Sequence, residues 1–297
     1  MRSNGYLLIF TAALLWGMIG PVAKVALASG MQPLEIAFWR TSIGWFFFAA
    51  HAISSRQYRI GRKDLFWVLA FGVLGVAGLF GNYVVAVRTG GAALAAVLLY
   101  TAPAWVALLS RLLLGETMTP LKLASVALTI LGVAAVCMGQ GGSMRVTPAA
   151  VFFGLASGFS YALYYVFGKR FLGSYATPTL FLLAMPAGAV VMLPFFEFTA
   201  HPPQAWVSVF VLGLGSTYLA YSIYYAGLKY LEATRAAVAA TLEPVAAAVL
   251  AYIWWDEYFN LLGYAGSGLI LGAVLLTMYD GARQRRLASK ALLTDHA

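Results

Sequence analysis

Long apolar stretches follow one another along almost the whole chain, separated by short polar segments. Each stretch has about 20 residues, the length that a helix needs to cross the hydrocarbon core of a bilayer. Transmembrane strands are shorter and alternate between apolar and polar side chains, so the pattern predicts helices. The ten predicted spans are residues 6–28, 34–53, 65–87, 92–114, 121–138, 148–167, 178–196, 206–228, 236–255 and 261–279.

The two halves of the chain resemble each other. A shift of 141 positions places Pro103 on Pro244 and Glu116 on Glu257, and a shift of 145 positions aligns the first two spans of each half. Chance accounts for matches between apolar residues, but less well for matched prolines and glutamates. Five spans per copy is an odd number, so the two copies must cross a membrane in opposite orientations.

This pattern predicts an all-α integral membrane protein with ten transmembrane helices in two inverted five-helix repeats. We assign residues 1–142 to the first repeat, residues 143–280 to the second, inverted repeat, and residues 281–297 to a basic, disordered cytoplasmic tail. Inverted repeats build many secondary transporters, in which the substrate binds near the membrane midplane between the repeats.

Composition and charge placement support a membrane protein. Hydrophobic residues make up 62% of the chain and charged residues 10%, against about half and a quarter in a soluble domain. The net charge is +9, but 15 of the 19 basic residues lie in segments on the same side as the N-terminus. This positive-inside bias predicts a multi-pass protein of the cell inner membrane with both termini cytoplasmic, surrounded by lipid and without a nucleic-acid partner. The 15 residues are Arg2, Arg56, Arg59, Arg62, Lys63, Arg111, Lys122, Lys169, Arg170, Lys229, Arg235, Arg283, Arg285, Arg286 and Lys290.

Two prolines in the middle of spans, Pro103 and Pro244, are repeat partners. Each removes a backbone donor and frees a carbonyl four residues earlier. The fourth and ninth helices should therefore bend at equivalent depths, either as static kinks or as hinges. Glycines at spacing three, from Gly72 to Gly81 in the third span, predict close packing against a neighbouring helix.

Catalytic and cofactor-binding patterns are missing from the sequence. His51, His201 and His296 are far apart and have no metal-ligand spacing. No phosphate-binding loop, nucleophile elbow or zinc-binding helix motif occurs, and neither does the charge ring or carbonyl filter of a channel. We therefore expect a protein that is not an enzyme, uses no metal or cofactor, and has a small-molecule substrate.

Residues 234–276 read TRAAVAATLEPVAAAVLAYIWWDEYFNLLGYAGSGLILGAVLL. This segment resembles the signature of the EamA family in the drug/metabolite transporter superfamily, with its small residues, mid-helix Pro, Glu at the helix end and glycine-containing last helix. Pro103, Glu116 and Gly132 stand at the corresponding places in the first half, and the LLWG of residues 14–17 resembles the family's first helix. Within the superfamily the chain is most similar to the YddG-type exporters of aromatic amino acids.

The resemblance implies a central cavity lined by the first, third, fourth, sixth, eighth and ninth helices. Tyr161 departs from the first-helix pattern, because it stands where the first half has Trp16.

Glu243 is the most informative single residue, because it lies within the ninth span directly before Pro244. A carboxylate inside the membrane is costly and marks a functional site by default. Glu243 would exchange a proton or bind the ammonium group of a substrate, so proton coupling stays open. The alternative is a structural residue that supports the bend at Pro244.

Aromatic residues supply the rest of the predicted site. Tyr218, Tyr221 and Tyr225 share one face of the eighth helix. Rings with polar tips around a cavity suit an aromatic or amphipathic solute, whereas ordinary helix packing is the alternative for each of them. The predicted substrate-binding residues are Trp16, Asn82, Tyr83, Tyr100, Tyr161, Tyr165, Tyr218, Tyr221, Tyr224 and Glu243.

Four further charged residues have a structural interpretation. Lys24 and Arg40 lie toward the outer ends of the first two helices, where we expect them to reach the headgroups; attracting a substrate carboxylate is the alternative. Glu116 and Glu257 end their helices, and we expect them to pair with nearby loop cations, with gating as the alternative.

Together these observations predict a secondary transporter that exports small organic metabolites by alternating access, above all amino acids with aromatic or apolar side chains. An exporter of organic cations or drugs that uses Glu243 is the first alternative. A sugar-phosphate carrier would need several cations in its cavity. Outside the transporter class, the alternatives are a membrane enzyme and a lipid-handling or scaffold protein without transport.

Overall fold

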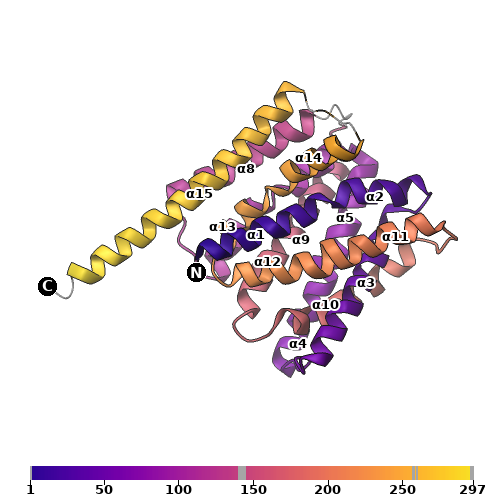
Figure 1. Cartoon of the computed structure of the whole chain (residues 1–297), viewed down its shortest axis with the longest axis horizontal. Helices are drawn as coiled ribbons and strands as arrows, with labels where there is room; N and C mark the ends of the chain where they lie inside the picture. Colours follow the sequence, from indigo (N-terminus) through magenta and orange to yellow (C-terminus); the bar gives the residue numbers. More distant parts are fainter. Residues whose placement is uncertain (1, 140–144, 256–257, 259, 295–297) are drawn as a thin grey trace.

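The computed structural model describes residues 2–139, 145–255, 258 and 260–294. These residues form a bundle of helices, and no strand occurs among them. In Figure 1 the N-terminus lies at the end of the bundle from which the last helix, α15, projects. We call this end of the molecule the N-terminal end and the other the opposite end.

Each half contains both long single helices and spans that are broken into shorter elements. The first half contains α1 Arg2–Gly17, α2 Ile19–Ala28, α3 Pro33–Ser54, α4 Arg62–Phe71, η1 Gly72–Ala77, α5 Gly78–Gly90, α6 Ala92–Leu99, α7 Ala102–Leu113 and α8 Pro120–Gly139. The second half contains α9 Pro148–Phe171, α10 Thr177–Met192, η2 Leu193–Phe195, α11 Pro203–Val211, η3 Leu212–Leu219, α12 Ala220–Leu228, α13 Ala233–Ala240, α14 Glu243–Trp255 and α15 Leu261–Thr294.

Nine helical segments of the described chain are long and apolar enough to cross a membrane. The tenth long helix is α3, whose 22 residues include Glu35, Arg40 and His51 and are therefore less apolar. Six of these spans are built from more than one element, because α1 continues into α2, α4 through η1 into α5, α6 into α7, α10 into η2, α11 through η3 into α12, and α13 into α14.

Packing between the halves follows the repeat. Helix α1 packs on α12, and its counterpart α9 packs on α5 with the roles of the halves exchanged. Likewise α3 packs on η3 and its counterpart α10 packs on η1, while the last helices of the halves, α8 and α15, pack on each other (Figure 1). A two-fold axis in the membrane plane produces this exchange. The predicted fold of ten transmembrane helices in two inverted repeats is confirmed.

The third span of each half contains a π-helical segment at the repeat-equivalent place, η1 and η3. A Cβ atom at Gly72 would collide with the Ala184 carbonyl of α10, and one at Gly213 would collide with Ile43 of α3. These glycines therefore let η1 and η3 approach their neighbouring helices closely. Single turns of π-helix are often found at functional sites.

The fourth span of each half is broken at an equivalent depth, as the matched prolines predict. Two residues separate α6 from α7, and two separate α13 from α14. Pro103 and Pro244 take the second position of α7 and α14, where a missing N–H costs little. Thr101 and Thr241 each donate a side-chain hydrogen bond to the carbonyl three residues earlier, at 2.6 and 2.5 Å, and so satisfy acceptors at the break.

The C-terminal segment differs from the prediction. Residues 281–294, expected to be disordered, continue α15 as one helix of 34 residues that extends beyond the bundle (Figure 1). The segment ARQRRLASKALL, residues 282–293, consists mainly of strong helix formers and contains no Pro or Gly. A helix already formed within the bundle also supplies the nucleus, so its extension costs little.

Candidate substrate cavity

A cavity of about 550 Å³ lies between the two halves of the molecule. Its wall on the first span runs from Trp16 to Leu27, and its wall on the ninth span runs from Glu243 to Ala251. These stretches are the halves of the two spans that lie away from the N-terminal end. The cavity reaches the surface at the opposite end, where Lys24 and Leu27 are exposed.

Six of the ten predicted substrate-binding residues line this cavity. They come from α1, α5, the α6–α7 break, α9, α12 and α14, which belong to the six helices that the family resemblance implied. The third span contributes Phe80 as well, and the second and fifth spans contribute Arg40 and Cys137. The six are Trp16, Tyr83, Tyr100, Tyr161, Tyr221 and Glu243.

Two of the remaining predicted residues lie directly behind this wall. Tyr224 is 1% exposed, with its ring centroid 5.2 Å from that of Trp16. Tyr165 is 3% exposed and lies 5.2 Å from the ring centroid of Tyr161. Both residues position lining side chains but do not reach the cavity themselves, because each belongs to the neighbouring face of its helix.

The last two predicted residues lie elsewhere. Tyr218 forms a 3.1 Å hydrogen bond with Nδ1 of His51 and packs its ring on Phe48, so it joins η3 to α3. Asn82 is half-buried on α5 beside the lining residue Tyr83, but it is not part of the cavity wall.

Glu243 begins α14 immediately after the break in the ninth span. The Tyr161 hydroxyl donates a 3.0 Å hydrogen bond to its Oε2 atom, and Tyr100 faces the same carboxylate. Glu243 is the first residue of α14, and the N-terminus of a helix favours a negative charge. The break thus provides a polar position within an otherwise apolar span.

Arg40 corrects the sequence interpretation, since it does not reach toward the headgroups. The side chain is buried, 6% exposed, and lines the cavity from α3. Its Nε atom donates a 3.2 Å hydrogen bond to Thr217 Oγ1, and the guanidinium carbon lies 5.4 Å from the ring centroid of Phe80. The cost of an intramembrane charge, applied to Glu243, could have identified Arg40 as well.

Aromatic rings fill the space between the cavity and the N-terminal end. Tyr221 stacks on Tyr164 with ring centroids 5.0 Å apart, and Phe181 lies 5.2 Å from Tyr221 and 5.1 Å from Tyr225. The Tyr225 hydroxyl donates a 2.9 Å hydrogen bond to the Tyr164 carbonyl. All four residues are buried, so this layer closes the floor of the cavity.

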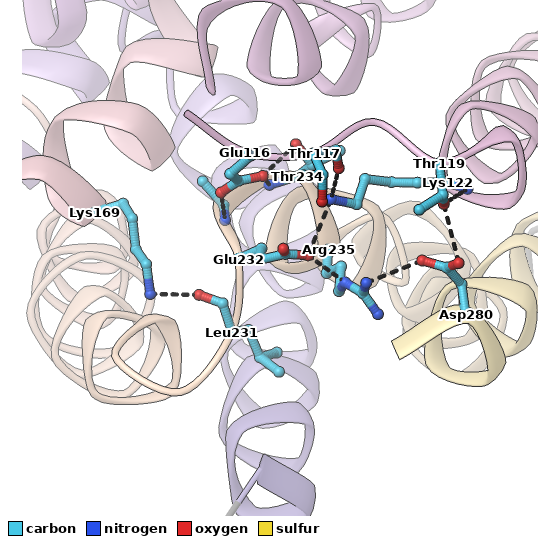
Figure 2. A network of polar contacts seen from close by, with 11 residues as sticks. Glu116, Thr117, Thr119, Lys122, Lys169, Leu231, Glu232, Thr234, Arg235 and Asp280 are labelled. Atoms are coloured by element: carbon cyan, nitrogen blue, oxygen red, sulfur yellow. Dashed lines mark hydrogen bonds and ion pairs between the residues drawn. The ribbon is translucent and has the colours of Figure 1, made fainter. Parts of the chain in front are cut away.

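Below the aromatic layer, a polar network joins the two halves at the N-terminal end (Figure 2). Glu116, from the segment that follows α7, accepts hydrogen bonds from Ala233 N at 2.5 Å, Thr234 N at 3.3 Å and Thr234 Oγ1 at 2.8 Å. It therefore caps α13 of the other half. The expected loop cation is replaced by a helix N-terminus, which also favours an anion. Its repeat partner Glu257 lies outside the described residues.

Ion pairs complete the network. Lys122 Nζ lies 3.0 Å from Glu232 Oε2, and Arg235 bridges the carboxylates of Glu232 and Asp280, with 2.9 Å between its Nη2 atom and Asp280 Oδ2. Thr119 donates a 3.0 Å hydrogen bond to Asp280 (Figure 2). Partial burial alone would raise the pKa of Glu232, but Lys122 and Arg235 outweigh it and hold that pKa below its usual range.

Lys169 binds backbone carbonyls next to this network. Its ammonium group donates a hydrogen bond of 2.8 Å to the Leu228 carbonyl. It donates another of 2.5 Å to the Leu231 carbonyl, at the turn between α12 and α13 (Figure 2). Lys122, Lys169 and Arg235 entered the sequence analysis only as contributors to topology. The pairs of Lys122 with Glu232 and of Lys169 with the Leu228 and Leu231 carbonyls join residues more than 50 positions apart, so no local pattern signals them. The Glu232–Arg235 pair has the local i,i+3 spacing of a helix, whereas the contact of Arg235 with Asp280 depends on the tertiary structure.

Within the described residues no group of His, Cys, Asp or Glu side chains has the arrangement of a metal site. The geometry instead defines a class of protein: a membrane transporter with inverted repeats and a central cavity open at one end.

The chain belongs to the EamA-like transporter family, whose model matches residues 3–138 and again residues 148–279. It is 28% identical to an "Uncharacterized inner membrane transporter YicL" of Salmonella typhimurium, over 96% of this chain and 98% of that protein. It is 26% identical to a "Probable amino-acid metabolite efflux pump" of the same organism, over 97% of this chain and 98% of that one.

Two further comparisons are informative. The chain is 28% identical to a "Probable terminal-alkyne amino-acid exporter" of Streptantibioticus cattleyicolor, over 66% of this chain and 67% of that protein. A solved crystal structure superposes with a TM-score of 0.81 at 22% identity and covers 96% of this chain and 99% of the solved one; it shows the same fold.

Proposed function

We propose that the protein exports amino acids with aromatic or apolar side chains across the cell inner membrane by alternating access. The observation that carries the proposal is the cavity itself, which is lined by aromatic and apolar side chains, by the Glu243 carboxylate and the Arg40 guanidinium, and at its open end by Lys24. Two relatives bear names that describe amino-acid export, and a third is named an inner membrane transporter.

The closed N-terminal end and the open opposite end correspond to one of the two states that alternating access requires. The inverted repeats make the other state equivalent, with the closing contacts formed by the counterpart segments. The positive-inside bias supports a cytoplasmic location of the N-terminal end. The structure then corresponds to the state open to the outside, and the network around Glu232 is the cytoplasmic closure.

An exporter of organic cations is the second candidate, because Glu243 offers a carboxylate inside the cavity. Arg40 in the same cavity opposes it, since a second cation would be repelled there.

Flux through purified protein in liposomes tests the proposal. Phenylalanine, leucine, an organic cation and a sugar phosphate are each supplied as labelled substrate, with and without a proton gradient. We expect saturable flux of the two amino acids and none of the sugar phosphate. Flux of the organic cation alone would replace the proposal by its rival, and proton-gradient dependence would establish coupling.

The orientation has a separate test. Single cysteines are introduced at the exposed positions Arg59 and Ala200 in a Cys137→Ala background, which removes the cavity thiol. An impermeant thiol reagent added to intact cells should label only the cysteine at position 200. Labelling at position 59 would reverse the orientation and with it the direction assigned to the open state.

A further inference from the structure

We propose that Arg40 is the carboxylate-binding group of the cavity and that, together with Glu243, it restricts transport to zwitterions such as neutral α-amino acids. The inference rests on the proposed function and specifies its substrate class. It assigns a binding role to a residue that the sequence favoured as a headgroup anchor, with attraction of a substrate carboxylate as the alternative.

Arg40 and Glu243 carry opposite charges and line one cavity without pairing with each other, while Lys24, the third charged lining residue, is exposed at the open end of the cavity. Arg40 comes from α3 in the first half and Glu243 from α14 in the second. Among the described residues, no carboxylate lies within ion-pair distance of Arg40, and no cation lies within that distance of Glu243. A buried charge without a counter-ion is costly, so both positions are ready to accept a charged ligand group.

Neutral side chains hold each of the two charged groups in place and leave it free to bind a ligand. The Arg40 Nε–H is used by Thr217, and Phe80 lies beside the guanidinium. Arginine has five N–H donors in a rigid fork, and the terminal nitrogens match the two oxygens of a carboxylate. Glu243 accepts a hydrogen bond from the neutral Tyr161 hydroxyl, which holds the carboxylate in place without neutralising it.

The cavity that contains the two charges also offers an apolar surface. The side chains of Trp16, Tyr221 and Phe80 line the same cavity, and aromatic rings there provide an apolar surface for a substrate side chain. A zwitterion satisfies Arg40 with its carboxylate and Glu243 with its ammonium group. An amine leaves Arg40 unpaired and a carboxylic acid leaves Glu243 unpaired, so each of them binds with one uncompensated charge.

Competition in proteoliposomes tests the inference. The flux of labelled phenylalanine is measured against unlabelled phenylalanine, phenethylamine, which lacks the carboxylate, and 3-phenylpropanoate, which lacks the ammonium group. Each analogue should compete about 10- to 100-fold less well than phenylalanine, as expected for one lost hydrogen-bonded charge pair. Equal competition by phenethylamine would overturn the role of Arg40.

Variants localise the effect. Arg40→Gln should lose most of the discrimination against phenethylamine and keep that against 3-phenylpropanoate. Arg88→Gln is the matched control, because Arg88 is an exposed basic residue on α5 that is not part of the cavity wall. If Arg40→Gln discriminates against phenethylamine as strongly as the wild type does, the inference is contradicted.

Two other outcomes, no amino-acid transport by the wild type and no folded Arg40→Gln variant, are distinguished from a failure of the inference itself. If the wild-type protein transports none of the amino acids, the proposed function fails, and the zwitterion inference fails with it. If Arg40→Gln is not recovered folded, Arg40→Lys is used instead, because it keeps the charge but lacks the planar fork. We then expect the affinity of Arg40→Lys for phenylalanine to be several-fold lower than that of the wild type. Equal affinities of the variant and the wild type would contradict the inference.

Discussion

The cavity and the closed N-terminal end use the same kinds of side chain in opposite ways. In the cavity, Arg40 and Glu243 stand apart, and each is held by a neutral hydroxyl. At the N-terminal end, Lys122, Glu232 and Arg235 meet at ion-pair distances and bridge the two halves. Charges separated in a cavity are available for a ligand, whereas charges paired across an interface hold that interface closed.

The energetic difference follows from burial. Lys122 and Asp280 are each 1% exposed in their side chains, so both depend on their partners for charge compensation. Removing one member of such a pair leaves an isolated buried charge, which costs about 3–5 kcal/mol. Because the ion pairs share partners, we expect them to form and break together, as a switch between two discrete states requires.

The largest effect is expected at Asp280. Asp280→Ala leaves Arg235 with Glu232 alone and should destabilise the closed N-terminal end by about 3 kcal/mol, the lower limit for a broken buried pair. Thermal unfolding in detergent measures this loss, and a cysteine at Thr117 should become more reactive toward an impermeant reagent from that side. Arg283→Ala, at an exposed site on the same helix, is the control. Equal stability of the two variants would show that the ion-pair network does not stabilise the closed N-terminal end.

The next effect concerns Glu243. Glu243→Gln preserves the shape of the side chain and removes its charge, so substrate affinity should fall about 10- to 100-fold if the carboxylate binds an ammonium group. Transport is measured against pH for wild type and variant in the same liposomes. If the carboxylate couples to protons, the pH dependence should also disappear. If the two curves of transport against pH coincide in shape and amplitude, Glu243 has only a structural role in the bend.

Glu116 tests the network from its capping side. Glu116→Ala removes three hydrogen bonds to the N-terminus of α13 and should cost about 1–2 kcal/mol, the usual value of a helix cap. Glu116→Gln keeps an acceptor oxygen and should recover part of that loss. The measurement is thermal unfolding. A glutamine variant as unstable as the alanine variant would mean that the charge, rather than the cap, matters.

The smallest effects separate lining from packing among the tyrosines. Tyr161→Phe removes the hydroxyl bonded to Glu243 and should reduce phenylalanine affinity several-fold, by about 1 kcal/mol. Tyr224→Phe is the matched control, because its buried hydroxyl has no hydrogen-bond partner in the described structure, and it should leave transport and stability nearly unchanged. Equal losses in both variants would show that the loss of a buried hydroxyl in general, and not of the hydrogen bond to Glu243, lowers transport.

The sequence by itself determined the architecture. Hydrophobic length specifies the spans because the bilayer leaves few alternatives for a backbone, and the odd number of spans per repeat requires their inversion. The matched prolines likewise predicted the breaks beside Tyr100 and Glu243, because a missing N–H acts locally.

Only the tertiary structure decided which polar residues meet. Helical periodicity gives the face on which Tyr218 and Tyr221 lie, but it does not tell that one contacts His51 and the other the cavity. Arg40 was misplaced because its environment is supplied by Thr217, far along the chain. The pairing of Glu116 with α13 depends in the same way on how the two halves pack, and no local rule encodes that contact.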